Sequence, residues 1–424
     1  MKRISIVGFG KIGQAIAAHI LKQGISITAV DINTELQTSL KNARFVTNEP
    51  GVGDILAKAY GNQKLAITAD YSSIKGSDAI IIAIPLLIDE HKKILDVPFV
   101  DTIKNIAPFT IGKIPVIIET SIPVGFSRDS VVPEFESGGK HHGADFLLAH
   151  SPERIKSGTM LEQLSQIPKI IGGVTKEATE ASFEIYKLFF EESLLYKVES
   201  AEAAEMIKLA GMVYRDVNIA LSNQLAQFAD AKGIHFTELI SLINTDREAG
   251  LLQPGIGVGG HCTPVYPYFM IENFRESGLD FTLAAQSRAI NDSMVEHAVS
   301  SVKDKVKRKK ALLLGLSFRP NVKEDAMSVT YRLNETLIKH GFDVTVHDAE
   351  YSTEEIMAKG FTAVSDIYES KVEVVFLVTM HKEYFQLDFE KLAKNGVRFF
   401  IDGRNSINRD DVEKSGISYT GIGR

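Results

Sequence analysis

The feature that most constrains the fold is a glycine pattern directly behind the first strand-like segment. Gly8, Gly10 and Gly13 follow the apolar run Ile4–Val7 and open a helical run, Gln14–Lys22. The first glycine permits a tight turn, the second lets the backbone approach a pyrophosphate, and the third lets helix and strand pack closely. The free N–H groups at the start of the helix then bind the anion. The pattern predicts a dinucleotide-binding turn, with a purely structural glycine turn as the alternative. Its expected cofactor contacts are Gly8, Gly10, Lys11, Ile12 and Gly13.

A carboxylate further along the chain predicts which dinucleotide binds. A second strand-like run, Ser26–Val30, ends at Asp31. A carboxylate there can accept hydrogen bonds from the adenine ribose and would repel the extra phosphate of NADP. Ile32 and Asn33 follow, so no arginine stands at these positions to receive such a phosphate. We therefore predict NAD as the cofactor.

Composition excludes several classes of protein. Of the 424 residues, 44% are hydrophobic and 24% are charged, which excludes a disordered, collagen-like or coiled-coil chain. A net charge of −7 gives no overall positive field to attract a phosphate backbone, so we expect no nucleic-acid partner. The longest apolar run, Ala79–Ile88, is interrupted by Pro85 and is too short to span a bilayer. The amino terminus runs directly into the first strand and is not a signal peptide, so we expect a soluble cytoplasmic protein without a membrane partner.

The single cysteine limits the possible metal and disulfide chemistry. It rules out an intrachain disulfide and a cysteine-based metal cluster within one chain, and it points to a reducing compartment. The pair His141-His142 lies in a polar, glycine-rich stretch without clustered carboxylates or thiolates. A solvated loop is therefore expected there rather than a metal pair, and no metal site is predicted.

The strand-like segments predict an α/β fold. In the first half they alternate with helical stretches, which is typical of a doubly wound parallel sheet. The segments are Ile4–Val7, Ser26–Val30, Ala79–Ile84, Val116–Glu119 and Phe146–His150. Strand-like runs resume near the carboxyl terminus at Ala311–Leu314, Asp343–His347, Val372–Val378 and Arg398–Ile401. The two groups predict two Rossmann-like parallel-sheet domains.

A long helix is expected between the two groups of strands. Residues 202–232 contain no proline and carry apolar residues at helical spacing, with Ser200 as a plausible N-cap and Gly233 as a plausible end. Such a helix would be roughly 45 Å long, which suits a spine that joins domains or subunits. The predicted domains are 1–198 (NAD-binding, Rossmann-like), 199–300 (central, helical, dimerisation) and 301–424 (Rossmann-like, substrate-binding).

The only cysteine lies in a glycine-rich segment, which is unusual for a structural thiol. Cys262 follows several glycines within 255–260, whereas a structural unpaired cysteine is more often buried on an apolar strand or helix. Glycines suit a backbone that must approach a ligand closely. Beside an NAD site, a thiolate can trap an aldehyde as a thiohemiacetal, whose hydride passes to NAD and leaves a thioester for water to cleave. The segment favours a catalytic nucleophile, and a structural thiol stays open. His261 is not expected to be its base, because adjacent side chains in extended backbone point apart.

Several further motifs carry a family resemblance. They are Glu119–Gly125 (ETSIPVG), Ser151–Arg154 (SPER), Lys208 with Tyr214–Ala220 (YRDVNIA), Gly257–Pro264 (GVGGHCTP) and Gly315–Pro320 (GLSFRP). With the glycine turn, and in this order, they make the chain resemble the UDP-glucose/GDP-mannose dehydrogenase family over nearly its full length. Within that family it is most similar to the UDP-N-acetylhexosamine 6-dehydrogenases. The resemblance implies two successive NAD-dependent oxidations that convert the C6 alcohol of a nucleotide sugar to a carboxylate.

The resemblance also implies roles for individual residues. Cys262 matches the nucleophile, and Lys208 matches a lysine that stabilises the oxyanion and assists proton transfer. Glu153 matches a carboxylate thought to act with a bound water in acid/base work on the thioester. Ser121 matches a threonine that holds this water, and Ser121 and Pro85 are further expected cofactor contacts. The structural alternatives are a solvated helix lysine, a helix-start carboxylate and a simple turn residue for Lys208, Glu153 and Ser121.

Two positions depart from the family pattern. Many members have asparagine four residues after the catalytic lysine, where this chain has Met212, which cannot donate a hydrogen bond. Many have aspartate four residues after the cysteine, where this chain has Tyr266. Loss of one oxyanion donor lowers a rate by on the order of 100-fold or more. Either neighbouring groups compensate, or the later oxidation is altered.

The resemblance further predicts the substrate contacts. Arg319 and Arg404 can bind a diphosphate bidentately, with a salt bridge between domains as the alternative. Arg215 and Asn218 favour an acetamido sugar, and Arg247 stands where members often supply an arginine to a neighbouring subunit. The full set of predicted substrate contacts is Glu153, Arg154, Lys208, Arg215, Asn218, Arg247, Gly259, Phe318, Arg319 and Arg404.

The sequence thus predicts an NAD-dependent 6-dehydrogenase of a UDP-N-acetylhexosamine, with UDP-N-acetylmannosamine as the best candidate, that serves surface polysaccharide synthesis. The same chemistry on UDP-glucose or GDP-mannose is the second possibility. A non-catalytic protein that binds NAD and a sugar nucleotide is a third, motivated by Met212 and Tyr266. An ordinary two-electron dehydrogenase would need no cysteine. The long helix and the resemblance predict a homodimer or a higher homo-oligomer.

Overall fold

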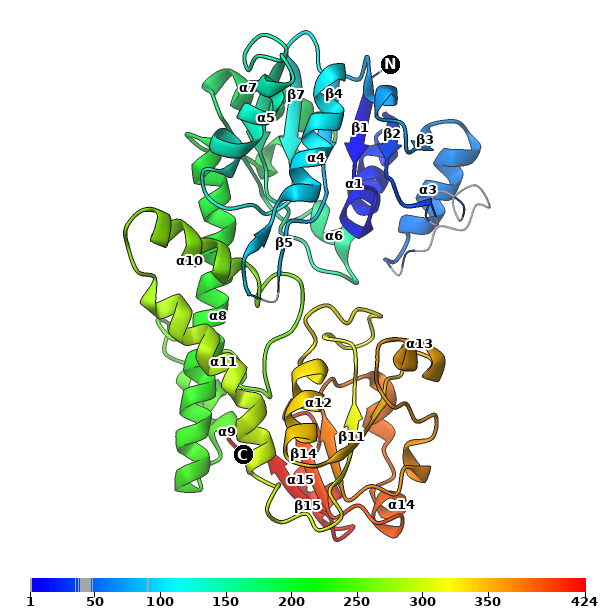
Figure 1. Ribbon diagram of the computed structural model, residues 1–424, viewed down its shortest axis with the longest axis vertical. Coiled ribbons are helices and arrows are strands. Elements are labelled where there is room, and N and C mark those ends of the chain that lie inside the picture. The colour runs from blue at the N-terminus through cyan, green and yellow to red at the C-terminus, as the bar shows by residue number, and fades with distance from the viewer. Residues whose placement is uncertain (1, 35, 37, 39–46, 48, 90) are drawn as a thin grey trace. The chain divides into compact units, whose positions relative to one another are not determined.

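The apolar runs of the sequence form the central strands of two large sheets, of which the first is mostly and the second entirely parallel (Figure 1). The computed structural model describes residues 2–34, 36, 38, 47, 49–89 and 91–424. Its two compact units are Met1–Gly211 with Tyr268–Ser277, and Met212–Pro267 with Gly278–Arg424. The predicted α/β class with two doubly wound sheets is confirmed, and the domain boundaries at 198 and 300 stay predictions.

The first unit contains an eight-stranded sheet in the order β10-β9-β8-β7-β4-β1-β2-β3. Its strands are β1 (Arg3–Val7), β2 (Ser26–Val30), β3 (Leu65–Thr68), β4 (Ala79–Ile82), β7 (Ile114–Ile118), β8 (Phe146–His150), β9 (Lys169–Gly173) and β10 (Leu195–Lys197). Neighbours pair in parallel except β8 with β9. The strand order reverses between β1 and β4, and such sheets bind ligands at the carboxyl ends of the strands beside this point. A small antiparallel pair is formed by β5 (Leu87–Ile88) and β6 (Ile94–Leu95).

Helices and an apolar core hold this sheet in place. The helices are α1 (Lys11–Lys22), α3 (Val52–Gly61), α4 (Val97–Ile106), α5 (Val132–Ser137), α6 (Met160–Leu164) and α7 (Lys176–Tyr186). Every residue of β4 and β8 is buried, as expected where helices cover both faces of a parallel sheet. One cluster of buried side chains joins Ile6 of β1 and Ile16 of α1 to Tyr186 at the end of α7.

The long helix α8 (Ala201–Lys232) confirms the helix that was expected over 202–232. The hydroxyl of Ser200 accepts a hydrogen bond from the N–H of Ala203 at 3.2 Å, which is N-cap geometry. Gly233 ends the helix with a φ of +66°, and the N–H of Ile234 donates back to the carbonyl of Ala229 at 2.9 Å. Both ends are therefore determined by local side-chain and backbone chemistry.

The second unit contains a five-stranded parallel sheet in the order β12-β11-β13-β14-β15. Its strands are β11 (Lys310–Leu314), β12 (Asp343–His347), β13 (Val374–Leu377), β14 (Phe399–Asp402) and β15 (Ser418–Gly421). Helices of this unit are α9 (Phe236–Ile243), α11 (Thr282–Ser300), α12 (Val329–Lys339), α13 (Thr353–Ala358), α14 (Phe389–Lys394) and α15 (Arg409–Glu413). α10 (Tyr266–Glu276) begins in the second unit and lies mostly in the first. The order reverses between β11 and β13, which again marks a ligand-binding edge.

Four strands of the two large sheets are absent from the sequence-based prediction, namely β3, β9, β10 and β15, and the small pair β5 and β6 is absent from it as well. The sequences of the four are LAIT, KIIGG, LYK and SYTG. All four are short, and the last three mix glycine or charge with apolar residues. They show neither an apolar run nor a clear alternation, and they form because a neighbouring strand supplies backbone partners. Among the described residues, the structure has no helix with both the length and the apolar character needed to cross a membrane.

Candidate active site

The glycine turn after β1 has the geometry that its spacing predicts. Gly8 has a φ of +92°, and a Cβ placed there would lie 2.8 Å from the carbonyl oxygen of Ala83. A Cβ on Gly13 would lie 2.1 Å from the carbonyl oxygen of Gly8, so α1 can pack this close to β1 only with glycine at this position. Both positions therefore require glycine for reasons internal to the fold.

At position 10 no contact inside the described part of the fold requires glycine, in contrast to positions 8 and 13. No atom of the described residues lies within 4 Å of a Cβ placed on Gly10. In this part of the chain no side chain caps the start of α1, although Gly10 is its N-cap residue. Lys11 and Ile12, both half-buried, form the first turn that follows. The N–H groups at the start of α1 and the open space beside Gly10 fit a pyrophosphate, so the residues present fit a bound dinucleotide.

Asp31, directly after β2, is held against the glycine turn. Its carboxylate accepts hydrogen bonds from the N–H of Phe9 at 2.7 Å and from the N–H of Asn33 at 2.8 Å. Each carboxylate oxygen can accept a second bond, so these contacts leave capacity for a ribose hydroxyl. Pro85 is exposed and follows β4, and Ser121 is buried and follows β7. The register pairs Val7 with Ile82 and Ile82 with Ile118, so all these segments leave the sheet at one edge.

Glu153 lies buried in the same unit, in the segment that follows β8. One of its carboxylate oxygens accepts the N–H groups of Arg154 at 2.6 Å and Ile155 at 2.9 Å. The other oxygen pairs with Nζ of Lys169 at 2.9 Å. Burial by itself raises the pKa of Glu153, but Lys169 and the two N–H groups outweigh it and hold the pKa below its usual value.

Lys208 meets Glu153 from α8. Its ammonium donates to the main-chain carbonyl of Glu153 at 2.8 Å, and the side chain is only 7% exposed. Lys208 is therefore not a solvated helix lysine. Glu205, one turn earlier, accepts the N–H groups of Gly125 at 2.6 Å and Ser127 at 3.1 Å. This contact ties the start of α8 to the loop after β7 and so helps to place Lys208.

Three further acidic or basic groups near Glu153 are not among the predicted residues. Glu119 accepts bonds from Lys169 and from the hydroxyl of Tyr186, and it is completely buried. Burial raises the pKa of Glu119 to about 7 despite these partners. Lys169 was detectable as a lysine within an otherwise apolar KIIGG segment, and Glu119 opens a motif that the sequence analysis already used. Their pairing, however, depends on strand order.

Cys262 lies in the second unit, in the loop that leads into α10. The cysteine is half-buried, and its carbonyl accepts the N–H groups of Val265 at 3.1 Å and Tyr266 at 2.9 Å. The thiol-bearing residue therefore stands where the helix begins. His261 lies 3.8 Å from Glu324 through Nε2 and packs edge-on against Phe318, with ring centroids 6.1 Å apart.

The glycines before Cys262 have a packing reason that the sequence did not reveal. A Cβ on Gly259 would lie 2.9 Å from Cβ of Phe318, and one on Gly260 would lie 2.8 Å from its ring. The N–H of Gly260 also donates to the carbonyl of Ala326 at 2.9 Å. These glycines let the cysteine loop approach Phe318, which follows β11 at the edge where the strand order reverses.

Arg404 and Arg319 lie at the same edge of this sheet. The guanidinium of Arg404 donates to the carbonyl of Val378 at 2.6 Å and to the carbonyl of Gly257 at 3.3 Å. Burial lowers the pKa of Arg404 to about 10. Arg404 thus ties the cysteine loop to the end of β13. The guanidinium of Arg319 lies 5.7 Å from the centroid of the Phe318 ring.

The remaining predicted substrate contacts lie on α8 and in the loop that follows α9. Asn218 donates to the carbonyl of Gly250 at 2.7 Å and accepts the N–H of Leu252 at 2.8 Å, so its amide shapes this loop. Arg215 and Arg247 are exposed. Glu153, Arg154, Lys208 and Ser121 belong to the first unit, whereas Cys262, Arg215, Asn218, Arg247, Gly259, Phe318, Arg319 and Arg404 belong to the second.

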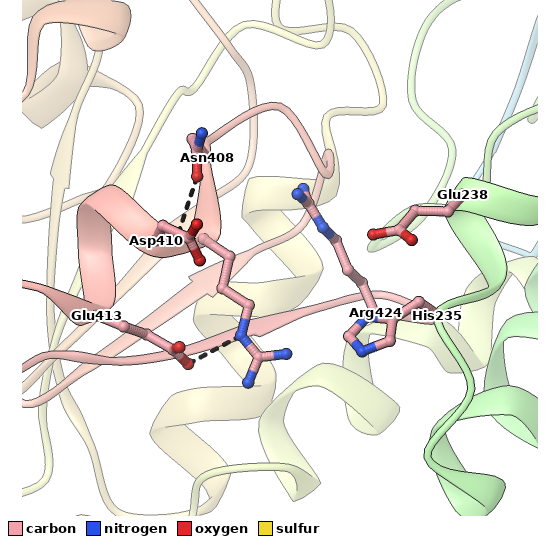
Figure 2. A pocket seen from close by; sticks show the side chains of 7 residues that line it. His235, Glu238, Asn408, Asp410, Glu413 and Arg424 are labelled. Atoms are coloured by element: carbon pink, nitrogen blue, oxygen red, sulfur yellow. Dashed lines mark hydrogen bonds and ion pairs between the residues drawn. The ribbon is translucent and has the colours of Figure 1, made fainter.

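A polar pocket of about 440 Å³ opens elsewhere in the second unit (Figure 2). It is lined by His235, Glu238, Asn408, Arg409, Asp410, Glu413 and Arg424. The guanidinium of Arg409 pairs with Glu413 at 2.9 Å, and Asn408 accepts the N–H of Asp410 at the start of α15. None of these described residues is a predicted site residue. The described chain also contains no group of three or more His, Cys, Asp or Glu side chains that could hold a metal ion.

Comparison with known domains accounts for this organisation. Residues 2–190 match the NAD binding domain of the UDP-glucose/GDP-mannose dehydrogenase family. Residues 202–293 match its central domain, and residues 312–409 match its UDP binding domain. The chain belongs to the UDP-glucose/GDP-mannose dehydrogenase family. It is an NAD-dependent oxidoreductase, and the NAD prediction is confirmed.

Individual members of this dehydrogenase family are similar over the whole chain. A UDP-N-acetyl-D-mannosamine dehydrogenase of Methanocaldococcus jannaschii is 30% identical and covers 100% of this chain and 96% of its own length. The solved UDP-D-ManNAc dehydrogenase of Pyrococcus horikoshii has a TM-score of 0.89 at 27% identity, and the match covers 100% of this chain and 99% of that one. An NDP-N-acetyl-D-galactosaminuronic acid dehydrogenase of Methanosarcina mazei has a TM-score of 0.85 at 25% identity, and the match covers 100% of this chain and 95% of that one.

Proposed function

We propose that this dehydrogenase oxidises the C6 alcohol of a UDP-N-acetylhexosamine to a carboxylate in two NAD-dependent steps. The observation that carries the proposal is the position of Cys262. Its loop packs on Phe318 within the UDP binding domain, so the chain's only thiol lies beside the edge expected to hold the nucleotide sugar. A two-electron alcohol dehydrogenase needs no such thiol, whereas a four-electron oxidation can use one to hold the intermediate aldehyde.

The chemistry assigned to Cys262 is nucleophilic. The first oxidation removes a hydride and a proton from the alcohol and leaves an aldehyde. The thiolate of Cys262 adds to the aldehyde carbon and forms a thiohemiacetal, and loss of a second hydride from that carbon gives a thioester. Water then cleaves the thioester, which releases the carboxylate and restores the thiol.

In the proposed mechanism Lys208 stabilises negative charge on the substrate, and Glu153 accepts a proton. The ammonium of Lys208 stabilises the alkoxide and the tetrahedral oxyanion, which is worth most in a buried setting. Glu153, whose pKa is held low by Lys169, is a carboxylate at neutral pH and takes a proton from the attacking water. Ser121, buried after β7, holds that water. Met212 supplies no second oxyanion donor, so the proposal assigns this duty to Lys208.

The glycine turn and Asp31 hold the cofactor. The N–H groups at the start of α1 face the pyrophosphate, Gly10 leaves room for it, and Asp31 accepts from the ribose. Bound NAD supplies the hydride acceptor for both oxidations. The cytoplasmic location and the role in surface polysaccharide synthesis are part of the same proposal.

UDP-N-acetylmannosamine is the best substrate candidate, because similar chains that cover all of this one carry that name. Other relatives are named for N-acetylgalactosaminuronic acid, which keeps the acetamido group in common. UDP-glucose and GDP-mannose lack this group. Arg319 and Arg404, at the reversal edge of the UDP binding domain, are the proposed contacts of the diphosphate.

A homodimer is proposed to form through one face of α8. Tyr214, Leu221 and Phe228 are spaced by seven residues, so they lie on one stripe of the helix. They are 66%, 49% and 58% exposed, which is unusual for large apolar side chains in a row. A second copy of the chain that packs along this stripe would cover them.

The test is the amount of NADH formed per mole of limiting sugar. UDP-N-acetylmannosamine, UDP-N-acetylglucosamine, UDP-N-acetylgalactosamine, UDP-glucose and GDP-mannose are run separately at saturating NAD. About two NADH from one sugar identifies the substrate and the four-electron route. About one NADH means that the second oxidation is lost, and none with any sugar favours the binding protein.

A covalent intermediate gives an independent measurement. Because Cys262 is the only cysteine, an adduct seen in the intact mass maps to one residue. Glu153→Gln should slow hydrolysis and let the thioester accumulate, whereas Cys262→Ser should show no adduct and no turnover. His261→Ala, the neighbouring control, should keep turnover. Full activity of Cys262→Ser would contradict the thioester route.

A further inference from the structure

Lys169 lies inside the first unit between two glutamates. Its Nζ pairs with Glu153 at 2.9 Å and with Glu119 on its other side. The side chains of Lys169, Glu119 and Glu153 are 3%, 1% and 7% exposed. One ammonium therefore serves two carboxylates in a place that water does not reach.

The remaining carboxylate oxygens of this cluster are also occupied. Tyr186 donates its hydroxyl to the second oxygen of Glu119. The second oxygen of Glu153 accepts the main-chain N–H groups of Arg154 and Ile155. The three charged residues come from consecutive strand ends, after β7, after β8 and at the start of β9. The cluster is thus built by the sheet and leaves little freedom to its side chains.

Among Lys169, Glu119 and Glu153 alone, the charges do not balance without a proton. Two carboxylates and one ammonium leave one negative charge, and burial of an uncompensated charge is costly. A proton on one carboxylate removes this cost. Glu119 is the carboxylate that receives it, since burial raises its pKa to about 7 while Lys169 and two N–H groups keep the pKa of Glu153 low.

Other titratable groups act on the same cluster from every side. Tyr186 comes from α7, His150 from β8, Lys208 from α8 and His19 from α1. Burial lowers the pKa of His150 to about 3 and also lowers that of His19, so both are neutral near pH 7. The pKa of Tyr186 is raised well above 10, mainly by burial. Among these neighbours, Lys208 alone adds a charge near neutrality, and this positive charge offsets part of the negative charge of the cluster. The assignment of the proton to Glu119 therefore rests on its deeper burial and on the two N–H groups that Glu153 accepts.

We propose that Lys169 is a positioning residue for Glu153, and that Glu119 takes up the proton of the cluster so that Glu153 stays ionised. The inference rests on the proposed role of Glu153 as the base in thioester hydrolysis. Lys169 fixes one oxygen of Glu153 and supplies its counter-charge. Glu119 absorbs changes in pH that would otherwise protonate Glu153.

Substitutions at Lys169 test this arrangement through the pH profile of overall turnover. Lys169→Met removes the ammonium that contacts both buried carboxylates, so the acid limb of kcat should move upward by about 1–3 pH units. Lys169→Arg keeps the charge and should restore the wild-type limb. The double variant Lys169→Met with Glu119→Gln also removes the negative charge of Glu119, which opposes ionisation of Glu153. Its acid limb should therefore lie between those of Lys169→Met and the wild type. A folded Lys169→Met enzyme with the wild-type limb would overturn the proposal.

A spectroscopic measurement separates this proposal from the proposed function. Infrared spectra of protein labelled with 13C-glutamate report protonated buried carboxyls whether or not the enzyme turns over. The difference between wild type and Glu119→Gln isolates Glu119 from Glu205, whose pKa burial also raises to about 7. The Glu119 band should be lost with a midpoint near pH 7. In Lys169→Met a further protonated carboxyl should persist at neutral pH and vanish when Glu153→Gln is added.

The outcomes are distinguishable. If the wild type oxidises no nucleotide sugar but these bands appear as expected, the proposed function fails and the charge arrangement stands. If the wild type forms two NADH but Lys169→Met gains no protonated carboxyl, the function stands and the role of Lys169 fails. If Lys169→Met does not fold, the variant Glu119→Gln by itself tests the proposal. It must lose one protonated carboxyl and keep the acid limb of kcat where it is, because glutamine reproduces the neutral form of Glu119 that Glu153 already faces at low pH. An unchanged spectrum would refute the proposal.

Discussion

The three glycines in the turn after β1 occur there for two different reasons, close packing inside the fold and approach of the cofactor. Gly8 and Gly13 are required by contacts inside the fold, since a Cβ on either would lie within 3 Å of a carbonyl oxygen. Gly10 has no such neighbour among the described residues. The proposed reason for glycine at this position lies outside the chain, namely that the pyrophosphate of the cofactor approaches its backbone.

A pair of substitutions distinguishes the two reasons. Gly13→Ala should cost more than about 2 kcal/mol of stability, because the methyl group meets a fixed carbonyl oxygen. Gly10→Ala should change stability by less than about 1 kcal/mol and weaken NAD binding by about tenfold or more. Thermal unfolding and titration with NADH measure the two effects. A Gly10→Ala protein that binds NADH as tightly as wild type would contradict the assignment.

Glu205 predicts how stability depends on pH. Its pKa is raised from 4.5 to about 7 by burial, so the folded chain holds a proton that the unfolded chain has lost in this range. This contribution is complete below pH 4.5 and declines as pH rises to about 7. Glu119 acts in the same direction, and His150, with a lowered pKa, acts in the opposite one.

Glu205→Gln should therefore flatten the stability curve. The free energy of unfolding, measured in urea at several pH values, should fall less steeply between pH 4.5 and about 7. The change in slope should reach up to roughly 1.4 kcal/mol per pH unit. Glu202→Gln is the matched control on the same helix, because its ion pair with Arg128 lowers its pKa and its titration lies below this range. An unchanged slope in Glu205→Gln would show that Glu205 is ionised in the folded chain.

At the scale of elements, α8 and α11 are joined by a buried polar network. Arg288 of α11 pairs with Asp216 of α8 at 2.6 Å, and both side chains are almost fully buried. Asn291 donates to Asp216 at 2.8 Å and accepts from Asn223 at 2.9 Å. The oxygen of Asn223 in turn accepts the N–H of Gly255, so the network reaches the loop that contains Cys262. The helix pair thus helps to position the cysteine.

Loss of the cation should destabilise this network strongly. In Arg288→Met the buried carboxylate of Asp216 keeps its hydrogen bond from Asn291 but loses its positive partner. This should lower the free energy of unfolding by about 3–5 kcal/mol. Arg275→Met is the control, because Arg275 pairs with Glu272 on the surface and such pairs contribute about 0–1 kcal/mol. Urea unfolding of both variants measures the difference. Equal stability of the two would mean that the buried pair contributes no more than an exposed one.

At the scale of the whole molecule, both sheets use the same connection at their reversal edges. Gly8 and Gly315 both have positive φ values directly after the first strand of their sheet, +92° and +107°. Asp31 and Asp348 follow the second strand and accept N–H groups from the turn after the first. Only the first turn continues as G-x-G-x-x-G. The repeated connection lies in the part that matches the NAD binding domain in one sheet and in the part that matches the UDP binding domain in the other.

Assembly is the prediction that belongs to this scale. Leu221→Glu with Phe228→Glu should convert the proposed dimer to a monomer, since the charges would be buried in the contact along α8. Light scattering after size-exclusion chromatography measures the mass. Exposed Leu279 provides a control, and Leu279→Glu should leave the mass unchanged. A monomeric wild type would refute the dimer.

The sequence by itself determined the strands next to the glycine turn, the turn and both ends of α8. These features depend on interactions within a few residues: glycine spacing, alternation of apolar residues and the caps at Ser200 and Gly233. They also sufficed for the family and for NAD. The placement of Pro85, Asp31 and Ser121 at one edge follows as soon as the order of the strands is known.

The tertiary structure decided how the buried charges are arranged. Lys169 is 50 residues from Glu119 and 16 from Glu153, and only the adjacency of β7, β8 and β9 brings them together. The sequence predicts that the glycines before Cys262 make room for a ligand, yet two of them accommodate Phe318. Burial and ion pairing depend on contacts between distant segments, and no local pattern records which segments will meet.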